Sequence, residues 1–128
     1  MRVFVTKVFA RFARKERIHD RQLREAVTRA ETGLVDADLG GNLVKQRVAR
    51  AGGGRSGGFR TIIAYRTAHR SVFLYGFPKS ERANIDDREL ANLKTLAKHY
   101  LSFTDLQIVR ALEQSELSEV ACDETEEG

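Results

Sequence analysis

Lysine and arginine side chains are concentrated in the middle of the chain, where they could bind a row of phosphates. Residues 45–82 contain nine basic side chains and one acid, a net charge of +8 against +4 for the whole chain. Arginine offers phosphate oxygens a planar fork of donors, and lysine a mobile point charge. Such groups can hold a phosphodiester and stabilise the charge that develops during its cleavage. A polyanionic partner is therefore one hypothesis, and a solvated basic face that only aids solubility is the other.

Five of these basic residues can meet at one edge of a β-sheet. Alternation along a strand places Lys45 and Arg47 on one face, about 7 Å apart, and Arg60 lies on the next strand across a hairpin. The candidate catalytic residues are Lys45, Arg47, Arg60, Lys79 and Arg82. Arginine is effectively always protonated, so a general base from this set would be Lys45 or Lys79, whose charged form the neighbouring cations disfavour. Arg60 and Arg82 would stabilise charge.

Residues around this edge could contact RNA outside the reacting phosphate. Two aromatic side chains of the last strand could stack on bases, with packing in the core as the alternative for each. Other candidates lie in or beside a glycine-rich hairpin loop and directly after the last strand. The candidate RNA-binding residues are Arg50, Arg55, Ser56, Tyr75, Phe77 and Ser80.

Other chemistries have less support in the sequence. The three histidines, His19, His69 and His99, are scattered, and Cys122 is the only cysteine. We therefore expect no metal site, no internal disulfide and no cofactor. The glycine-rich residues 52–58 lack the Lys-Ser/Thr ending of a P-loop and lie between two predicted strands, which argues against nucleotide hydrolysis.

Hydrophobic periodicity predicts the elements that position the basic residues. Apolar alternation indicates a strand over 2–6, and helical spacing indicates a helix over 8–16. A second helix should begin at a cap on Asp20 and end at Gly33. Residues 34–42 are expected to form a turn. Three strands then form an antiparallel meander, over residues 43–50, 59–66 and 71–77.

The acidic carboxyl-terminal third is predicted to be helical. Two capping-box patterns mark helix starts, Asp86 with Glu89 and Thr104 with Gln107. The second of these helices is expected to carry the apolar stripe Leu106, Val109 and Leu112. Residues 117–120 could add a short strand.

The predicted fold class is α+β, with a small antiparallel meander sheet, two N-terminal helices packed on it and a helical C-terminal extension. At 128 residues the chain fits one domain, which we assign to residues 1–120, followed by an acidic disordered tail over 121–128. No apolar run approaches the ~20 residues of a membrane span, and the amino terminus lacks the pattern of a secretory signal. We therefore expect a cytoplasmic protein that does not contact a membrane.

The order of these elements and four motifs resemble one known family. The motifs are DADLGG at 36–41, KQRVAR at 45–50, SGGFR at 56–60 and YGFPKSERANI at 75–85. Over residues 1 to about 120, the chain resembles a RelE/ParE-superfamily toxin of the HigB-like branch, from a type II toxin–antitoxin system. The resemblance implies a RelE-like fold and an mRNA interferase, an endoribonuclease that cuts mRNA in the ribosomal A site, inhibits translation and arrests growth.

The same resemblance implies a mechanism and partners. The reaction would be metal-independent, with the 2′-hydroxyl attacking the adjacent phosphate and the 5′-oxygen leaving. Arg60 matches the mid-sheet arginine that such toxins use on the scissile phosphate, and Lys79 or Arg82 matches the basic residue after the last meander strand. Lys45 and Arg47 match basic second-strand positions. The implied partners are mRNA, the ribosome with its rRNA, and a cognate antitoxin, a helix-turn-helix protein encoded adjacently.

The sequence departs from RelE-like toxins at its carboxyl-terminal end. Such toxins place a tyrosine close to that end, whereas Tyr100 is the only tyrosine in the helical third of this chain. No carboxylate or histidine accompanies the basic cluster, which suggests that the ribosome completes the reacting geometry. The alternative is a non-catalytic protein, either a ParE-like inhibitor of DNA gyrase or an RNA-binding module.

Overall fold

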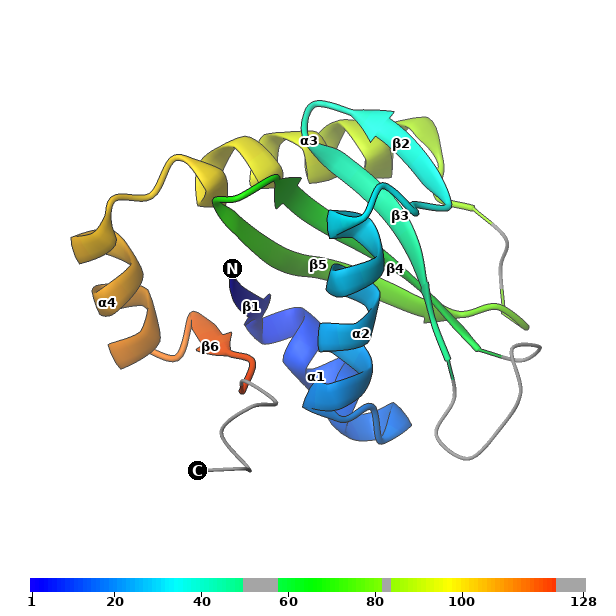
Figure 1. Ribbon diagram of the computed structural model, residues 1–128, viewed down its shortest axis with the longest axis horizontal. Helices are drawn as coiled ribbons and strands as arrows, with labels where there is room; N and C mark the ends of the chain where they lie inside the picture. Colours follow the sequence, from blue (N-terminus) through cyan, green and yellow to red (C-terminus); the bar gives the residue numbers. More distant parts are fainter. Residues whose placement is uncertain (50–57, 82–83, 122–128) are drawn as a thin grey trace.

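A single β-sheet with helices on both faces forms the body of the protein (Figure 1). The computed structural model describes residues 1–49, 58–81 and 84–121. Within them the strands are β1 (Arg2–Thr6), β2 (Ala37–Gly40), β3 (Leu43–Val48), β4 (Phe59–Arg66), β5 (Arg70–Pro78) and β6 (Leu117–Glu119). The helices of the same residues are α1 (Lys7–Glu16), α2 (Asp20–Glu31), α3 (Asp87–Leu101) and α4 (Asp105–Glu113).

The sheet is mixed, and its strand order is β2-β3-β4-β5-β1-β6. Strands β2 to β5 form an antiparallel meander, which confirms the predicted α+β class and the predicted pairing of its last three strands. The first strand, β1, then pairs parallel to β5, and the short β6 pairs antiparallel to β1. The sheet is thus larger than the predicted meander, because the strands at the two ends of the described chain extend it beyond β5, first β1 and then β6.

Each face of the sheet has its own apolar core. Helices α1 and α2 cover one face, where Phe9 and Val27 pack with Phe59 and Phe73. Helix α3 covers the other face, where its buried Leu93 belongs to a second apolar cluster with residues of β4 and β5. The C-terminal helices were expected as an extension, but α3 is a layer of the fold. The reason is that central strands with apolar side chains on both sides need a cover on each.

Local capping patterns predicted the starts of the carboxyl-terminal helices correctly. The Asp86 side chain accepts a hydrogen bond from the Glu89 backbone N–H (2.8 Å), and Thr104 accepts one from Gln107 (3.2 Å). The start of α2 differs, because His19 is the residue that precedes the helix. Asp20 instead accepts a hydrogen bond from the backbone N–H of Ala121 at 2.8 Å, a long-range contact that no local pattern reveals.

The predicted turn over 34–42 contains a strand. Residues Ala37–Gly40 form β2, which pairs with β3 at the edge of the sheet. Its side chains alternate between half-buried and exposed, and Leu39 packs against the α3 core. Glycine and aspartate are depleted in strands, which is why composition indicated a turn here. The following strand, β3, ends at Val48, earlier than the predicted residue 50.

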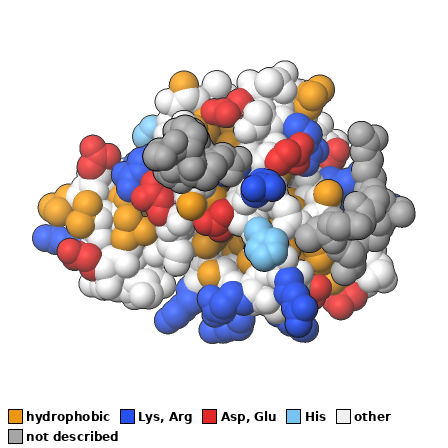
Figure 2. Space-filling model, turned by 60° about the horizontal axis from the view of Figure 1, so that its bottom comes forward, with side chains coloured by type: hydrophobic (Ala, Val, Ile, Leu, Met, Phe, Trp, Pro, Cys, Tyr) orange, Lys and Arg blue, Asp and Glu red, His pale blue; other side chains and the backbone are white. Residues whose placement is uncertain are grey.

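The predicted apolar stripe of α4 is wrong for two of its three residues. Leu106 and Val109 are 57% and 47% exposed, whereas Ile108 and Ala111 are buried. Both faces of this short helix carry apolar side chains, and the face with Ile108 and Ala111 is the one that packs against the α3 core. Figure 2 shows hydrophobic side chains at the surface on the side where α4 lies.

One glycine controls how closely α1 approaches the sheet. A Cβ atom on Gly76 would lie 2.6 Å from Phe12 Cε2 and 3.0 Å from Phe9 Cε1. Only glycine lets these two rings pack directly on β5, on the face opposite the neighbouring Tyr75 and Phe77. The predicted glycine-rich loop over 52–58 and the predicted acidic tail over 121–128 lie outside the described residues, except for Gly58 and Ala121.

Candidate functional site

Strand register brings three of the candidate catalytic residues together. Arg47 on β3 is the direct partner of Arg60 on β4, and Arg60 is the partner of Phe77 on β5. Two residues further along β3, Lys45 is the partner of Ile62, which is the partner of Tyr75. Partners in adjacent strands project from the same face with Cβ atoms about 5 Å apart. We call Lys45, Arg47 and Arg60 the cationic cluster.

The cationic cluster projects from the face of the sheet that α3 covers only in part. The intervening Gln46 donates from Nε2 to Ala26 O on α2 at 2.9 Å, and Val48 and Phe59 pack in the α1 and α2 core. Alternation therefore directs the cationic cluster to the opposite face. The α3 core on that face includes Ile62, and Arg60 lies two residues beyond it along β4.

Two guanidinium nitrogens of the cationic cluster are buried without a hydrogen-bond acceptor. Among the described residues, Arg47 Nε and Arg60 Nη1 have no partner. Neither guanidinium forms an ion pair with a carboxylate of those residues. Like charges directly opposite one another are unfavourable, and a buried donor without an acceptor costs about 1–3 kcal/mol. An anion placed between the two arginines would offset both costs, and phosphate has the oxygen geometry to do so.

Lys45 has a fixed partner within the site. Its Nζ donates a hydrogen bond to Asn84 Oδ1 at 2.8 Å. Asn84 comes from the segment between β5 and α3, so it links the cationic cluster to the connection that leads into α3. Sequence reasoning did not select Asn84, although it lies inside the motif at 75–85.

The remaining candidates lie around the cationic cluster or outside the described residues. Lys79 and Ser80 are exposed directly after β5, and the Lys79 backbone N–H donates to Gly58 O at 3.2 Å. Tyr75 is half-buried and its ring centroid lies 5.9 Å from that of Phe77. Phe77 is only 3% exposed, which favours its packing alternative. The candidates outside the described residues are Arg50, Arg55, Ser56 and Arg82.

His69 and His99 lie away from the cationic cluster. His69 is in the turn between β4 and β5, at the far end of these strands, and His99 packs against the rings of Tyr100 and Phe103. Within the described ranges, no group of three or more histidine, cysteine, aspartate or glutamate side chains could hold a metal ion. In the same part of the chain, no helix has the length and apolar character to cross a bilayer.

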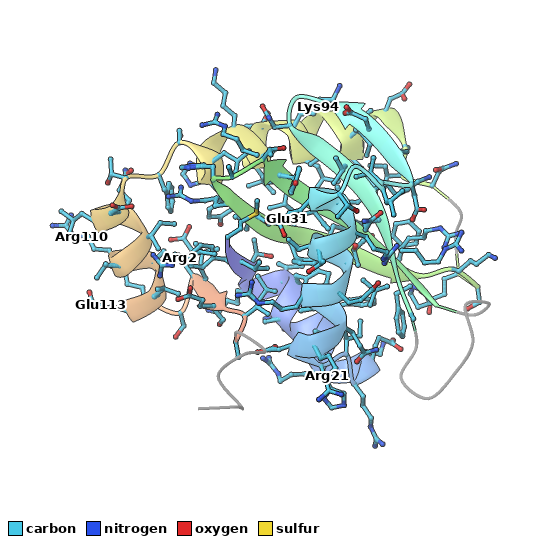
Figure 3. The ribbon with its side chains drawn as sticks, viewed as in Figure 1. Arg2, Arg21, Glu31, Lys94, Arg110 and Glu113 are labelled. Atoms are coloured by element: carbon cyan, nitrogen blue, oxygen red, sulfur yellow. The ribbon has the colours of Figure 1, made fainter. Side chains whose placement is uncertain are left out.

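Other basic side chains lie away from the cationic cluster. Figure 3 shows Arg110 on α4 and Arg2 beside β6, on the opposite side of the molecule from the segment between β5 and α3. Arg70 is buried at the start of β5, where desolvation lowers the pKa of its guanidinium. Burial and the neighbouring Glu116 raise the pKa of Tyr100 to about 12. Of the basic residues in 45–82, Arg70 therefore lies in a different environment from the cationic cluster.

The α+β fold with its cationic cluster agrees with the predicted class of protein, the small α+β toxins of the RelE/ParE superfamily. A family described as "RelE toxin of RelE / RelB toxin-antitoxin system" matches residues 1–120, and the chain belongs to this family. No curated protein is significantly similar to the chain. The match confirms the predicted superfamily and its toxin class. The HigB-like branch and the domain limit at residue 120 stay predictions.

Proposed function

We propose that this toxin is a ribosome-dependent endoribonuclease that cleaves mRNA and so inhibits translation and arrests growth. The observation that carries the proposal is the pair of buried, unpartnered nitrogens on Arg47 and Arg60, which face the same side of the sheet on adjacent strands. A phosphodiester of mRNA supplies the negative oxygens that these donors lack within the described residues. The family match supports the same activity, because RelE-family toxins are typically nucleases of this kind.

The proposed reaction is an in-line phosphoryl transfer without a metal ion. The 2′-hydroxyl loses its proton to a base and its oxygen forms a bond to the adjacent phosphorus, while the bond from phosphorus to the 5′-oxygen breaks. The departing 5′-oxygen takes up a proton, so the products are a 2′,3′-cyclic phosphate and a 5′-hydroxyl. Arg60 and Arg47 would stabilise the charge on the non-bridging oxygens, because preorganised donors act most strongly where charge develops. Arg82 is proposed to add to this stabilisation.

The proposed base is Lys45 or Lys79. Lys45 is held by Asn84 close to the two arginines, whereas Lys79 is exposed at the end of β5. No carboxylate of the described residues forms an ion pair with any of these groups. We propose that the ribosome, with its rRNA, orients the mRNA and completes the reacting geometry, since positioning alone can supply a large part of a rate enhancement.

Further contacts to mRNA are proposed for the residues around the cationic cluster. Tyr75 is half-buried on the same face and can offer one side of its ring to a base. Ser80 is exposed beside Lys79. Arg50, Arg55 and Ser56 complete the set of proposed RNA-binding residues, whereas the burial of Phe77 favours packing in the core for that ring.

The proposed partner is a cognate antitoxin that is encoded adjacently and carries a helix-turn-helix domain. An acidic segment of such a protein could cover the cationic cluster and supply carboxylates in place of phosphate. We further propose that the toxin acts in the cytoplasm, where mRNA and ribosomes are found.

The experiment is controlled expression in a bacterial host, followed by mapping of mRNA 5′ ends. New 5′ ends within translated regions are expected to accompany growth arrest. Arg60→Ala should relieve both effects, and Arg66→Ala is its matched control, because Arg66 is an exposed cation on the same strand as Arg60. Arrest with unchanged mRNA ends and loss of plasmid supercoiling would favour the gyrase alternative. RNA binding without arrest would favour the non-catalytic module.

A further inference from the structure

Strand β2 is too short to cover the whole edge of β3. The pairing of β2 with β3 runs from Gly40 opposite Leu43 to Ala37 opposite Lys45, and Lys45 is the last residue of β3 that it covers. The next residue whose backbone faces this edge is Arg47, because backbone groups alternate between the two edges of a strand. A hollow of about 340 Å³ lies here, lined by Glu25, Arg29, Asp36, Arg47 and Ala49.

Side chains replace the missing strand at this edge. The Arg47 backbone N–H donates to Asp36 Oδ2 at 2.6 Å, and its carbonyl accepts a hydrogen bond from Arg29 Nη2. Further along the edge, Gln22 Nε2 donates to the carbonyl of Ala49 at 2.6 Å. Every outward-facing backbone group of Arg47 therefore has a side-chain partner.

The partners of Arg47 are themselves held in place. Arg29 on α2 forms an ion pair from Nε to Glu25 Oε2 at 2.8 Å. The backbone N–H of Asp36 donates to Oε1 of Gln46 at 3.1 Å, and Gln46 is fully buried. Asp36 and Arg29 are thus tied to the strand and to the helix that packs on it, and not only to the residue that they hold.

We propose that Asp36 and Arg29 are positioning residues that hold Arg47 in register for the phosphate. This inference rests on the proposed function. At an uncovered edge the backbone N–H and C=O of Arg47 would bond only to water, and this end of β3 would be held by β4 alone. A shift of about 1 Å at a reacting centre can cost about 100-fold in rate. Both residues contact the backbone of Arg47 at the edge of the strand, and act on the phosphate through it.

The sign of a charge effect separates positioning from electrostatics. Asp36 is an acid next to a cationic cluster, so a purely electrostatic role predicts that its removal strengthens mRNA binding and does not slow cleavage. Positioning predicts slower cleavage. Asp36→Asn distinguishes the two further, because it removes the charge and keeps an oxygen that accepts the Arg47 N–H.

The experiment measures single-turnover cleavage of mRNA on programmed ribosomes. Asp36→Ala should slow cleavage at least about 10-fold, and Asp36→Asn should stay within about 2-fold of the unaltered toxin. In a background of Arg47→Ala, the added Asp36→Ala change should have no further effect, because a residue that acts through Arg47 cannot act without it. Asp38→Ala is the matched control, since this nearby aspartate accepts a backbone N–H from Gly40 instead.

Three outcomes would overturn the inference. Asp36→Ala could cleave at the rate of the unaltered toxin, or Asp36→Asn could be as slow as Asp36→Ala. In the third outcome, the rate losses caused by Asp36→Ala and Arg47→Ala would add. If Asp36→Ala does not fold, Arg29→Met takes its place in the same comparison with Arg47→Ala, because it removes the donor to the Arg47 carbonyl. If the unaltered toxin shows no cleavage at all, the proposed function fails and the inference falls with it. If the unaltered toxin cleaves mRNA but the effects of Asp36→Ala and Arg47→Ala add, the proposed function stands and only the positioning role is wrong.

Discussion

Arginines with buried side-chain nitrogens lie at both ends of the long central strands, and their surroundings differ. Arg70 begins β5, is 6% exposed, and donates from Nη1 to the carbonyls of Tyr100 and Phe103, each at 2.9 Å. At the other end, Arg47 and Arg60 each bury a guanidinium nitrogen that has no partner among the described residues. Within its described residues the chain thus provides acceptors for the Arg70 guanidinium and none for one buried nitrogen each of Arg47 and Arg60.

The difference follows from where α3 ends. The last turn of a helix has carbonyls without intrahelical partners, and α3 and the segment after it direct two such oxygens at Arg70. The described residues offer no equivalent oxygens beside Arg60, which lies two residues beyond the α3 core along β4. Unsatisfied buried groups call for an explanation. We interpret Arg70 as structural, and Arg47 and Arg60 as ligand-binding.

The largest expected effect comes from removing Arg60. Arg60→Ala should lower single-turnover mRNA cleavage about 10²–10³-fold, because a preorganised donor to the reacting phosphate is lost. Arg60→Met keeps the apolar stem, so its free energy of unfolding should be unchanged or higher once an unsatisfied charge is gone. Urea denaturation measures the second quantity. An active Arg60→Met variant would break the comparison between the two arginine environments.

Removing Arg70 should have the opposite pattern. Arg70→Met removes the side-chain donor to the carbonyls of Tyr100 and Phe103, and we expect a loss of about 1.5–3 kcal/mol in the free energy of unfolding. The cleavage rate per folded molecule should not change. Urea denaturation together with rates normalised to the folded fraction provides the check. A stable but inactive Arg70→Met variant would contradict its structural role.

Tyr100, whose carbonyl accepts a hydrogen bond from Arg70, makes the stability of this end of the sheet depend on pH. Its hydroxyl donates to Glu116 Oε2 at 3.1 Å, and burial with this carboxylate raises its pKa from 10.0 to about 12. The unfolded chain therefore loses this proton first, so its contribution to stability is complete below pH 10 and declines as pH rises toward about 12. The free energy of unfolding of Tyr100→Phe, measured between pH 10 and about 12, should therefore decline less with rising pH. An unchanged slope would show that Tyr100 does not titrate as expected.

The smallest expected effect is at an exposed, paired arginine. Arg2 forms two hydrogen bonds to Glu119, both 2.9 Å, and this contact holds the pKa of the Glu119 carboxyl below its usual range. Its contribution is present at neutral pH and declines as pH falls through that lowered pKa. Glu119→Gln should cost less than about 1 kcal/mol, because the pair is solvated. High salt should reduce the difference in melting temperature, and a salt-independent loss would contradict this reading of the pair.

Most elements of the fold were predictable from neighbouring residues. The capping boxes at Asp86 and Thr104 marked helix starts because their hydrogen bonds span only three residues. The meander strands were predictable because β-branched and aromatic residues bounded by turns mark strands. Strand β2 was missed because its glycine and aspartate indicate a turn, and only pairing with β3 makes it a strand.

The candidate site was predictable in part. Alternation correctly placed Lys45 and Arg47 on one face, and the register then added Arg60 to them. Arg29 carries no signal in the sequence, and the motifs that contain Asp36 and Asn84 did not reveal their contacts, because each residue contacts the site through hydrogen bonds that span 11 to 39 residues. Strand alternation also did not predict that Phe77 is buried while Tyr75, which packs against the α3 core, is half-buried.

Composition and local pattern were enough to establish a basic α+β domain with its cations on central strands, because strand and helix periodicity depend on near neighbours. They could not divide those cations by role. Arg60 and Arg70 belong to the same basic segment, and their difference depends on whether carbonyls from α3 reach them. That is a long-range property, since hydrogen-bond satisfaction in the interior depends on which distant segments pack together.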